Sequence, residues 1–355
     1  MRNSTITSYD VNALSDGDIV RLHLNESPFA LPPAVSQALE CKLERHLSLY
    51  PDSDCSALRT RLAEYVGVSP EMVAIGNGID ELILLTTLSL SGAKGKVILT
   101  ESTFPGYASS AAVVGAATEV VAVKDHGLVA NDIIRAFKSN ANIAFICNPH
   151  NPTGTILSSG DVDRMVDAAE AAGIIPIFDE AYMDYADDQR SSALRHVQTG
   201  RNILVMRTFS KAWGLASIRA GYVIGSPKAI GRIWEFRRTI PFNVNRFAQK
   251  LIPVALDNDE YLHSTRNVIR ITKEALYSYL DSRNLNYIPS VTNFVMVHVD
   301  RDSTYLAKRL IERHGVMIRD LAPFGIPGHV RISIGTPDDM KRLCEALDEE
   351  IFSNA

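Results

Sequence analysis

The sequence predicts an α/β protein with a large domain, built on a mostly parallel sheet between two layers of helices, and a smaller α+β domain after it. Between residues 73 and 225, short and nearly continuous apolar runs alternate with stretches of helical periodicity, a pattern typical of parallel strands joined by crossover helices. After Pro241 the pattern changes to a long helical stretch and then to isolated strands, which indicates a second unit. The 355 residues, 46% of them hydrophobic, suffice for about two domains with buried cores.

The first thirty residues or so are irregular, with prolines at 28, 32 and 33, and we interpret residues 1–30 as an N-terminal arm. The arm leads into a helix expected near Ala34–Leu47. We assign the large domain to residues 31–256 and the small C-terminal domain to residues 257–355.

Six apolar runs of the large domain are predicted as strands, and the amphipathic segments between them as helices. The strands are Lys96–Thr100, Glu119–Val123, Ile143–Cys147, Ile174–Asp179, Ile203–Thr208 and Ala220–Gly225. The clearest helices are Ile79–Ser91 and Ser159–Ala172. Beyond them we expect a helical region from Asn245 to about Leu280, a strand over 293–299, a helix over Thr304–Arg313, strands over 316–321 and 329–335, and a closing helix.

Composition excludes several classes of protein. The net charge of -5 argues against a nucleic-acid or anionic-membrane partner. The cysteines at 41, 55, 147 and 344 form no CxxC pair and lie near no histidine at ligand spacing, so neither a disulfide framework nor a metal site is expected. The N-terminus lacks the apolar stretch of a signal peptide, and the longest apolar run, Leu82–Leu90, is too short to cross a bilayer. We therefore expect a cytoplasmic protein.

Residues 208–214, Thr-Phe-Ser-Lys-Ala-Trp-Gly, directly follow an expected strand. A lysine in such a turn, just past a buried strand, can lose its proton through desolvation, and the neutral amine of Lys211 can then condense with an aldehyde. The hydroxyls of Thr208 and Ser210, with the guanidinium of Arg219, can bind a phosphate dianion nearby. The alternative is an ordinary surface lysine, because most lysines are exposed.

Asp179 ends the expected strand Ile174–Asp179 and is followed by Glu-Ala-Tyr. Open α/β sheets bind their ligands at the carboxyl ends of the strands. A buried carboxylate at that place can pair with a protonated ring nitrogen and keep it charged. A helix cap is the structural alternative, and no second acidic cluster supports a metal site.

Asn151 lies in the turn Asn148–Gly154, directly after the strand Ile143–Cys147. Two prolines and a glycine make such a turn rigid, and an asparagine fixed there can donate a hydrogen bond to an oxygen on a ligand ring. By itself the composition favours a plain structural turn.

The segment Gly76-Asn77-Gly78 precedes an apolar helix that begins with Ile79 and Asp80. Glycines at a helix N-terminus let the free backbone N–H groups reach a phosphate, and the helix dipole adds to the attraction. The segment matches neither the Walker A pattern nor the dinucleotide fingerprint. Capping of the helix by Asn77 is the structural alternative.

The sequence resembles the class I and II aminotransferases of fold type I over essentially the whole chain. The resemblance is carried, in order, by GNGIDE, TFPGY, NPHNPTG, DEAY, TFSKAWGLASIRAGY and HVRISIG. It implies the fold of aspartate aminotransferase, pyridoxal 5′-phosphate as cofactor, and a homodimer with shared active sites. Within this family the sequence is most similar to the histidinol-phosphate aminotransferases, through LNESP (24–28), YPD (50–52), PFNVN (241–245), IRD (318–320) and VRISIG (330–335).

The resemblance implies a role for each matching residue around the cofactor ring. Lys211 would hold the cofactor as a Schiff base, the internal aldimine, and would shuttle the reacting proton. Asp179 would pair with the pyridinium nitrogen. Tyr182 and Asn151 would contact the 3′ oxygen of the ring, and Phe104 would stack on its face.

The cofactor phosphate has its own set of implied ligands. They are the backbone amides of Ile79 and Asp80 and the side chains of Thr208, Ser210 and Arg219. Tyr50 would reach the same phosphate from the partner subunit, which makes each active site a shared one.

Arg319 and Arg331 each interrupt an expected apolar strand. A buried arginine is costly without an anionic partner, and Asp320 points to the opposite face of an extended strand. The resemblance implies that the two arginines form the anion site for the substrate, with Tyr9 and Asn25 of the arm closing over it. A salt bridge to a carboxylate elsewhere in the chain is the structural alternative.

The predicted reaction is transamination between histidinol phosphate and 2-oxoglutarate, a step of histidine biosynthesis. An aromatic or broad-range aminotransferase and a phosphothreonine-type decarboxylase are the alternatives that share the cofactor residues. The same two arginines can accept a carboxylate or a phosphate, so the residues leave this choice open. The intact lysine and the absence of a basic DNA-binding segment disfavour a non-catalytic regulator, and a nucleotide-binding protein would need phosphate motifs that this sequence lacks.

Overall fold

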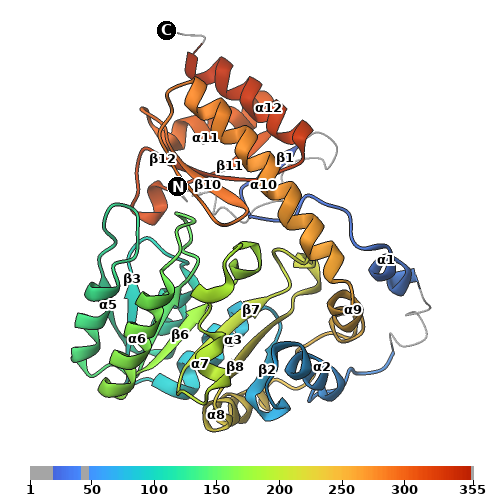
Figure 1. Ribbon diagram of the computed structural model, residues 1–355, viewed down its shortest axis with the longest axis vertical. Helices are drawn as coiled ribbons and strands as arrows, with labels where there is room; N and C mark the ends of the chain where they lie inside the picture. Colours follow the sequence, from blue (N-terminus) through green and yellow to red (C-terminus); the bar gives the residue numbers. More distant parts are fainter. Residues whose placement is uncertain (1–18, 41–47, 353–355) are drawn as a thin grey trace, which may run out of the picture.

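The computed structural model describes residues 19–40 and 48–352, which form a larger lower body and a smaller upper body joined by a long helix (Figure 1). The larger body contains a seven-stranded sheet in the order β2-β8-β7-β6-β5-β3-β4. Its strands are β2 (Val73–Gly76), β3 (Lys96–Thr100), β4 (Ala117–Val121), β5 (Ile143–Cys147), β6 (Ile175–Asp179), β7 (Leu204–Thr208) and β8 (Gly221–Gly225). All run parallel except β8, which is antiparallel to both of its neighbours. The predicted, mostly parallel sheet is confirmed.

Successive side chains of the central strands enter two separate cores, one on each face of the sheet. In β5, Ala144 and Ile146 pack into one core, whereas Ile143 and Phe145 pack into the other. The first core is covered by α2 (Ser56–Val66), α5 (Ala130–Ala136), α6 (Ser159–Ala172) and α7 (Leu194–Gln198), and the second by α3 (Ile79–Thr86), α4 (Gly106–Val114) and α8 (Pro227–Arg237). Burial on both faces explains why these strands are continuous apolar runs.

One strand and one helix of the larger body differ from the sequence prediction. β4 begins and ends two residues earlier than expected, because its pairing with β3 runs from Ala117 opposite Lys96 to Val121 opposite Thr100. It is an edge strand with mostly exposed side chains, so its hydropathy is a weak guide to its bounds. The helix expected over Ile79–Ser91 is α-helical only to Thr86 and continues as a π-helical turn over Thr87–Ser91.

The helical region expected from Asn245 to about Leu280 is present, but it consists of two helices, α9 (Arg246–Leu256) and α10 (Asp259–Ser282). Asn245 caps α9 by accepting a hydrogen bond from the N–H of Ala248. The helices are separated at Asp257 and Asn258, residue types that favour caps and turns over helix interiors. This break lets α10 leave the larger body and run up into the smaller one (Figure 1).

The smaller body contains a five-stranded sheet in the order β1-β11-β12-β10-β9. Its strands are β1 (Val20–Leu22), β9 (Tyr287–Ile288), β10 (Phe294–His298), β11 (Val316–Asp320) and β12 (His329–Ser333), and its further helices are α11 (Ser303–His314) and α12 (Pro337–Leu347). β1 comes from the expected arm and pairs in parallel with β11. The smaller α+β unit is confirmed, with a strand from the other end of the chain added to it.

The division at residues 1–30, 31–256 and 257–355 stays a prediction; residue 257 lies in the break between α9 and α10. The helix expected near Ala34–Leu47 is described only as α1 (Pro33–Glu40). Within residues 19–40 and 48–352, no helix is both long and apolar enough to cross a bilayer. The same residues contain no group of three or more His, Cys, Asp or Glu side chains that could hold a metal ion.

Candidate active site

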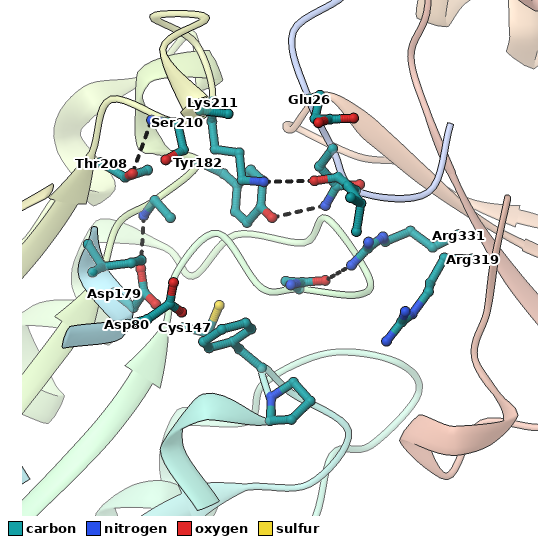
Figure 2. A pocket seen from close by; sticks show the side chains of 18 of the residues that line it. Glu26, Asp80, Cys147, Asp179, Tyr182, Thr208, Ser210, Lys211, Arg319 and Arg331 are labelled. Atoms are coloured by element: carbon teal, nitrogen blue, oxygen red, sulfur yellow. Dashed lines mark hydrogen bonds between the residues drawn. The ribbon is translucent and has the colours of Figure 1, made fainter. Parts of the chain in front are cut away.

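A cavity of about 410 Å³ lies between the two bodies, beside the carboxyl ends of β6 and β7 (Figure 2). Within the described part of the chain, every residue predicted for the site except Tyr50 lines this cavity. Those that line it are Asn25, Ile79, Asp80, Phe104, Asn151, Asp179, Tyr182, Thr208, Ser210, Lys211, Arg219, Arg319 and Arg331. The fold therefore brings together residues that were selected from separate motifs.

The floor of the cavity is made by two adjacent parallel strands. Asp179 is the last residue of β6 and Thr208 is the last residue of β7, and the register places Asp179 beside Met206. Because parallel neighbours end at the same edge of the sheet, the loops that follow them begin side by side. Those loops carry Tyr182 and Lys211 into the cavity.

The amine of Lys211 lies in the middle of the cavity (Figure 2). Its Nζ donates a hydrogen bond to the carbonyl oxygen of Leu24 at 2.8 Å and lies 5.7 Å from the centroid of the Tyr182 ring. Burial, and then the charge of Arg331, lower the pKa of Lys211 to about 8. The neutral, nucleophilic amine is therefore far more populated at neutral pH than it is for an exposed lysine.

Asp179 is a buried carboxylate with a hydrogen bond to each oxygen. The hydroxyl of Tyr107 donates to Oδ2 at 2.5 Å, and the N–H of Ala181 donates to Oδ1 at 3.0 Å. Burial raises the pKa of Asp179 to about 6, an effect that the Tyr107 and Ala181 hydrogen bonds partly offset. The group is thus mainly ionised at neutral pH, as a partner for a cationic ring nitrogen must be.

The other end of the cavity collects hydrogen-bond donors and positive charge. Here α3 begins at Ile79, so the first N–H groups of the helix have no intrahelical partner. Arg219 pairs with Asp80 at 3.0 Å, and its Nη1 lies 3.5 Å from Ser210 Oγ. The backbone of Arg219 is in the left-handed region, with a φ of 55°, a strained conformation that tends to occur at functional sites. The arrangement is suited to an anion.

Asn151 and Tyr182 are oriented by other residues that line the cavity. Arg331 donates to Asn151 Oδ1 at 2.6 Å. Because a guanidinium has only donors, this contact fixes the amide so that Nδ2 remains a donor. The hydroxyl of Tyr182 accepts from Asn25 Nδ2 at 2.9 Å, so its own proton is available to a ligand oxygen.

Arg319 and Arg331 are direct cross-strand partners in the antiparallel pair β11 and β12, and both line the cavity from the side of the smaller sheet (Figure 2). The guanidinium of Arg319 lies 5.0 Å from the centroid of the Phe324 ring, and that of Arg331 lies 5.3 Å from Phe294. Asp320 faces away, as expected, and accepts hydrogen bonds from two hydroxyls at the start of α11. The two guanidinium groups thus project from the same face of the smaller sheet towards the cavity.

The two remaining predicted residues are Tyr9 and Tyr50. Tyr9 lies outside the described residues. Tyr50 is 78% exposed, stacks on Phe242 at 4.5 Å between ring centroids, and is not among the residues that line the cavity.

Sequence reasoning missed three neighbours of the predicted residues. Glu26 and Cys147 line the cavity, and Tyr107 bonds to Asp179 from below it. Cys147 ends β5, the same position that drew attention to Asp179 in β6. Tyr107 lies in the first turn of α4, three residues after Phe104. It ends the TFPGY motif, and its place in that motif is the signal by which it could have been found.

A sequence profile of the family described as aminotransferase class I and II matches residues 17–347. The chain is 30% identical over 333 residues to histidinol-phosphate aminotransferase 2 of Pasteurella multocida, with 94% of this chain and 90% of that protein covered. It is 33% identical over 336 residues to the histidinol-phosphate aminotransferase of Moorella thermoacetica, with 94% and 85% covered. The fold matches the crystal structure of histidinol-phosphate aminotransferase from Sinorhizobium meliloti in complex with pyridoxal-5′-phosphate, with a TM-score of 0.85, 27% identity, and 95% of this chain and 92% of that chain covered.

Proposed function

The chain belongs to the aminotransferases of class I and II, and we propose that it transfers the amino group of histidinol phosphate to 2-oxoglutarate. Family membership establishes the coarser activity: the protein is a pyridoxal-phosphate-dependent aminotransferase. The similarity to the relatives named above supports the choice of amino donor. The observation that carries this choice is the pair of arginines, Arg319 and Arg331, placed directly opposite each other over the cavity.

The residues around the cavity fit pyridoxal phosphate by their chemistry. The start of α3, with Thr208, Ser210 and Arg219, supplies N–H donors, hydroxyls and a positive charge for the phosphate. Gly78 keeps this cradle open, because a Cβ atom there would lie 2.6 Å from the guanidinium of Arg219. The buried carboxylate of Asp179 suits a protonated ring nitrogen.

When bound, the cofactor supplies an aldehyde carbon and a ring that accepts electrons. We propose that Lys211 holds the aldehyde carbon and then moves the proton at the substrate Cα, which its lowered pKa favours. Asp179 keeps the ring nitrogen charged. The Nδ2 of Asn151 and the hydroxyl of Tyr182 orient the ring oxygen, since their other hydrogen-bonding positions are already engaged.

Arg319 and Arg331 are proposed to bind the phosphate of the amino donor, and Arg331 to bind the α-carboxylate of 2-oxoglutarate. Like charges directly opposite each other in a sheet repel, so an anion placed between them lowers the energy of the pair. A phosphate carries more charge and more acceptor oxygens than a carboxylate, and therefore compensates two guanidinium groups better than a neutral aromatic side chain does.

We further propose a homodimer in which Tyr50 reaches the cofactor phosphate of the partner. The exposed Tyr50 ring, its stacking partner Phe242, and the neighbouring Leu49 and Ile240 are large apolar side chains on the surface. Arg246 donates hydrogen bonds to the carbonyl oxygens of Leu49 and Tyr50 and so holds this segment in place. Contiguous exposed apolar surface of this kind marks sites of association.

The experiment that tests the proposed donor is a comparison of kcat/KM for histidinol phosphate, phenylalanine and phosphothreonine, with 2-oxoglutarate as acceptor. Glutamate formation and carbon dioxide release are followed in parallel. We expect histidinol phosphate to be preferred by about tenfold or more, because losing the phosphate leaves polar groups of the site unpaired. A preference for phenylalanine would assign an aromatic aminotransferase, and carbon dioxide release from phosphothreonine would assign a decarboxylase.

A further inference from the structure

Tyr107 lies beneath the floor of the cavity, and its hydroxyl bonds to the carboxylate of Asp179, which lines the cavity. The residue is 1% exposed and is not among those that line the cavity. Its hydroxyl donates to Asp179 Oδ2 at 2.5 Å, a separation typical of a hydroxyl bonded to a carboxylate. Asp179 therefore lines the cavity, and Tyr107 lies directly behind it.

The ring of Tyr107 is held by two other aromatic rings. It is stacked on Phe145 of β5, with 4.8 Å between the ring centroids and an interplanar angle of 9°. The edge contact with Phe104 has a centroid distance of 5.6 Å and an angle of 77°. Phe104 itself lines the cavity. The contacts that Tyr107 makes therefore fix its hydroxyl relative to two residues of the site, Phe104 and the carboxylate of Asp179.

Besides Tyr107, the ionisable groups that interact electrostatically with Asp179 include the carboxylates of Asp80 and Glu180, the thiol of Cys147 and the phenol of Tyr182. Both carboxylates have arginine partners of their own: Asp80 pairs with Arg219 at 3.0 Å and Glu180 with Arg207 at 2.8 Å. Within the described part of the chain, the hydrogen bonds to the Asp179 carboxylate come from neutral donors only, Tyr107 and the N–H of Ala181.

We propose that Tyr107 is a positioning residue for transamination: its hydroxyl fixes the Asp179 carboxylate and weakens that group's hold on a shared proton, so that the proton stays on the ring nitrogen of the cofactor. This inference rests on the proposed pairing of Asp179 with that nitrogen. A neutral donor stabilises the ionised carboxylate. A cation in its place would compete with the ring nitrogen for the carboxylate, and an apolar residue would leave a more basic carboxylate that takes the proton.

Two further observations fit this role. Burial raises the pKa of the Tyr107 phenol well above its usual range, so the hydroxyl keeps its proton and stays a donor at any working pH. The same burial raises the pKa of Asp179, and the Tyr107 hydrogen bond acts in the opposite direction. The Tyr107 hydrogen bond thus partly offsets the rise in the pKa of Asp179 that burial causes.

The direct test uses the protein without cofactor. Tyr107→Phe keeps both ring contacts and removes only the hydroxyl, whereas 3-fluorotyrosine at position 107 keeps the hydroxyl and makes it a stronger donor. The pKa of Asp179 is read from the carbon NMR signal of labelled aspartate carboxyl groups, assigned with Asp179→Asn. We expect the pKa to rise by about 1–2 in Tyr107→Phe, the effect of one hydrogen bond to a charged group, and to fall with fluorotyrosine.

In the loaded enzyme the proton itself can be followed. With the ring nitrogen of the cofactor labelled with ¹⁵N, Tyr107→Phe should shift its signal towards that of a neutral pyridine and lower kcat about tenfold or more, with KM nearly unchanged. Tyr279→Phe is the matched control, because it removes another tyrosine–aspartate hydrogen bond, to Asp348 at 2.9 Å, away from the cavity. This control should change neither signal nor kcat.

The outcomes separate this inference from the proposed function. An Asp179 pKa that moves with neither variant overturns the role of Tyr107. If Tyr107→Phe does not fold, the fluorotyrosine protein alone decides, since a purely structural tyrosine gives no downward shift. If Asp179→Asn leaves both the nitrogen signal and kcat unchanged, the proposed pairing of Asp179 is wrong, whatever Tyr107 does.

Discussion

The floor of the cavity comes from the larger sheet and its roof from the smaller one, and the two hold their charged groups differently. On the floor, Asp179 and Lys211 follow the ends of neighbouring parallel strands, and burial shifts the pKa of both towards neutrality. On the roof, Arg319 and Arg331 lie on two antiparallel strands beside β1 of the arm. Their charge does not depend on pH in the working range.

This difference assigns separate tasks to the two regions. The floor residues titrate near neutral pH and are suited to moving or sharing protons, which every substrate of the enzyme needs. The roof residues are permanent cations, suited to selecting among substrates by charge. Substitutions on the floor should therefore affect all substrates alike, and substitutions on the roof should change the preference among them.

The largest effect is expected at Lys211. Lys211→Ala should lower kcat by about 10⁴-fold or more for every amino donor, because the group that moves the proton is lost. The matched control is Lys273→Ala, which removes another partly buried lysine whose pKa is also lowered to about 8 but which binds two carbonyl oxygens away from the cavity. Single-turnover kinetics on the folded proteins provide the measurement; a Lys211→Ala enzyme with near wild-type turnover would contradict the whole assignment.

The next effect concerns Asp179. Asp179→Asn should lower kcat about a hundredfold to a thousandfold for all donors, because one preorganised electrostatic partner of the reacting ring is lost. Asp320→Asn serves as control, since this residue sits on the roof strand β11 but bonds to the start of α11. Steady-state kinetics distinguish the cases: a change in KM alone for Asp179→Asn would place the residue in substrate binding instead.

A smaller effect is expected at Tyr50, which lies in neither the floor nor the roof of the cavity in its own chain. Tyr50→Phe should weaken cofactor binding by about 10–150-fold, the effect of one hydrogen bond to a charged group. This variant is then mixed with Lys211→Ala, and the subunits are allowed to exchange. The cofactor concentration is kept too low to saturate the sites of Tyr50→Phe by itself. Under this condition, mixing should restore activity. In a shared-site dimer each hybrid regains one intact site, so an equal mixture should reach about a quarter of wild-type activity. No gain on mixing would mean that Tyr50 acts within its own chain or not at all.

The smallest effect is a pH dependence on the floor. The neutral amine of Lys211 is needed to capture an aldehyde, and its pKa is about 8. The rate of cofactor capture should therefore be highest above pH 8 and should fall about tenfold per pH unit below it. Stopped-flow absorbance measures this rate. Because the charge of Arg331 contributes to the lowered pKa, Arg331→Gln should move the midpoint to higher pH; an unchanged midpoint would assign the shift to burial alone.

Much of the floor could be predicted from the sequence because its strands are buried on both faces, which leaves continuous apolar runs that end at the polar residues of the site. Asp179, Asn151 and Lys211 were found in this way. The antiparallel direction of β8 could not be predicted, since an apolar run looks the same in either direction. Tyr107 was missed because Asp179, which accepts the hydrogen bond from its hydroxyl, lies 72 positions away in the sequence.

The roof was harder to predict than the floor. β1 has only three residues, and its partner β11 lies at the other end of the chain, so no local pattern indicates that the arm joins the smaller sheet. The break between α9 and α10 was also missed, because both helices keep an apolar face. The two arginines were found only because each interrupts an apolar strand. Their cross-strand pairing depends on a register that residue patterns do not specify.

The most direct test of this division of tasks is Arg319→Ala, with kcat/KM measured for histidinol phosphate, phenylalanine and phosphothreonine. Removing one of the two facing cations should lower kcat/KM for histidinol phosphate by about 2–4 kcal/mol, roughly 30- to 1000-fold at 1.4 kcal/mol per tenfold. The value for phenylalanine should change much less, because its side chain carries no charge for Arg319 to bind. Equal losses for all three donors would contradict the account, since Arg319 would then support the common chemistry and not the choice of substrate.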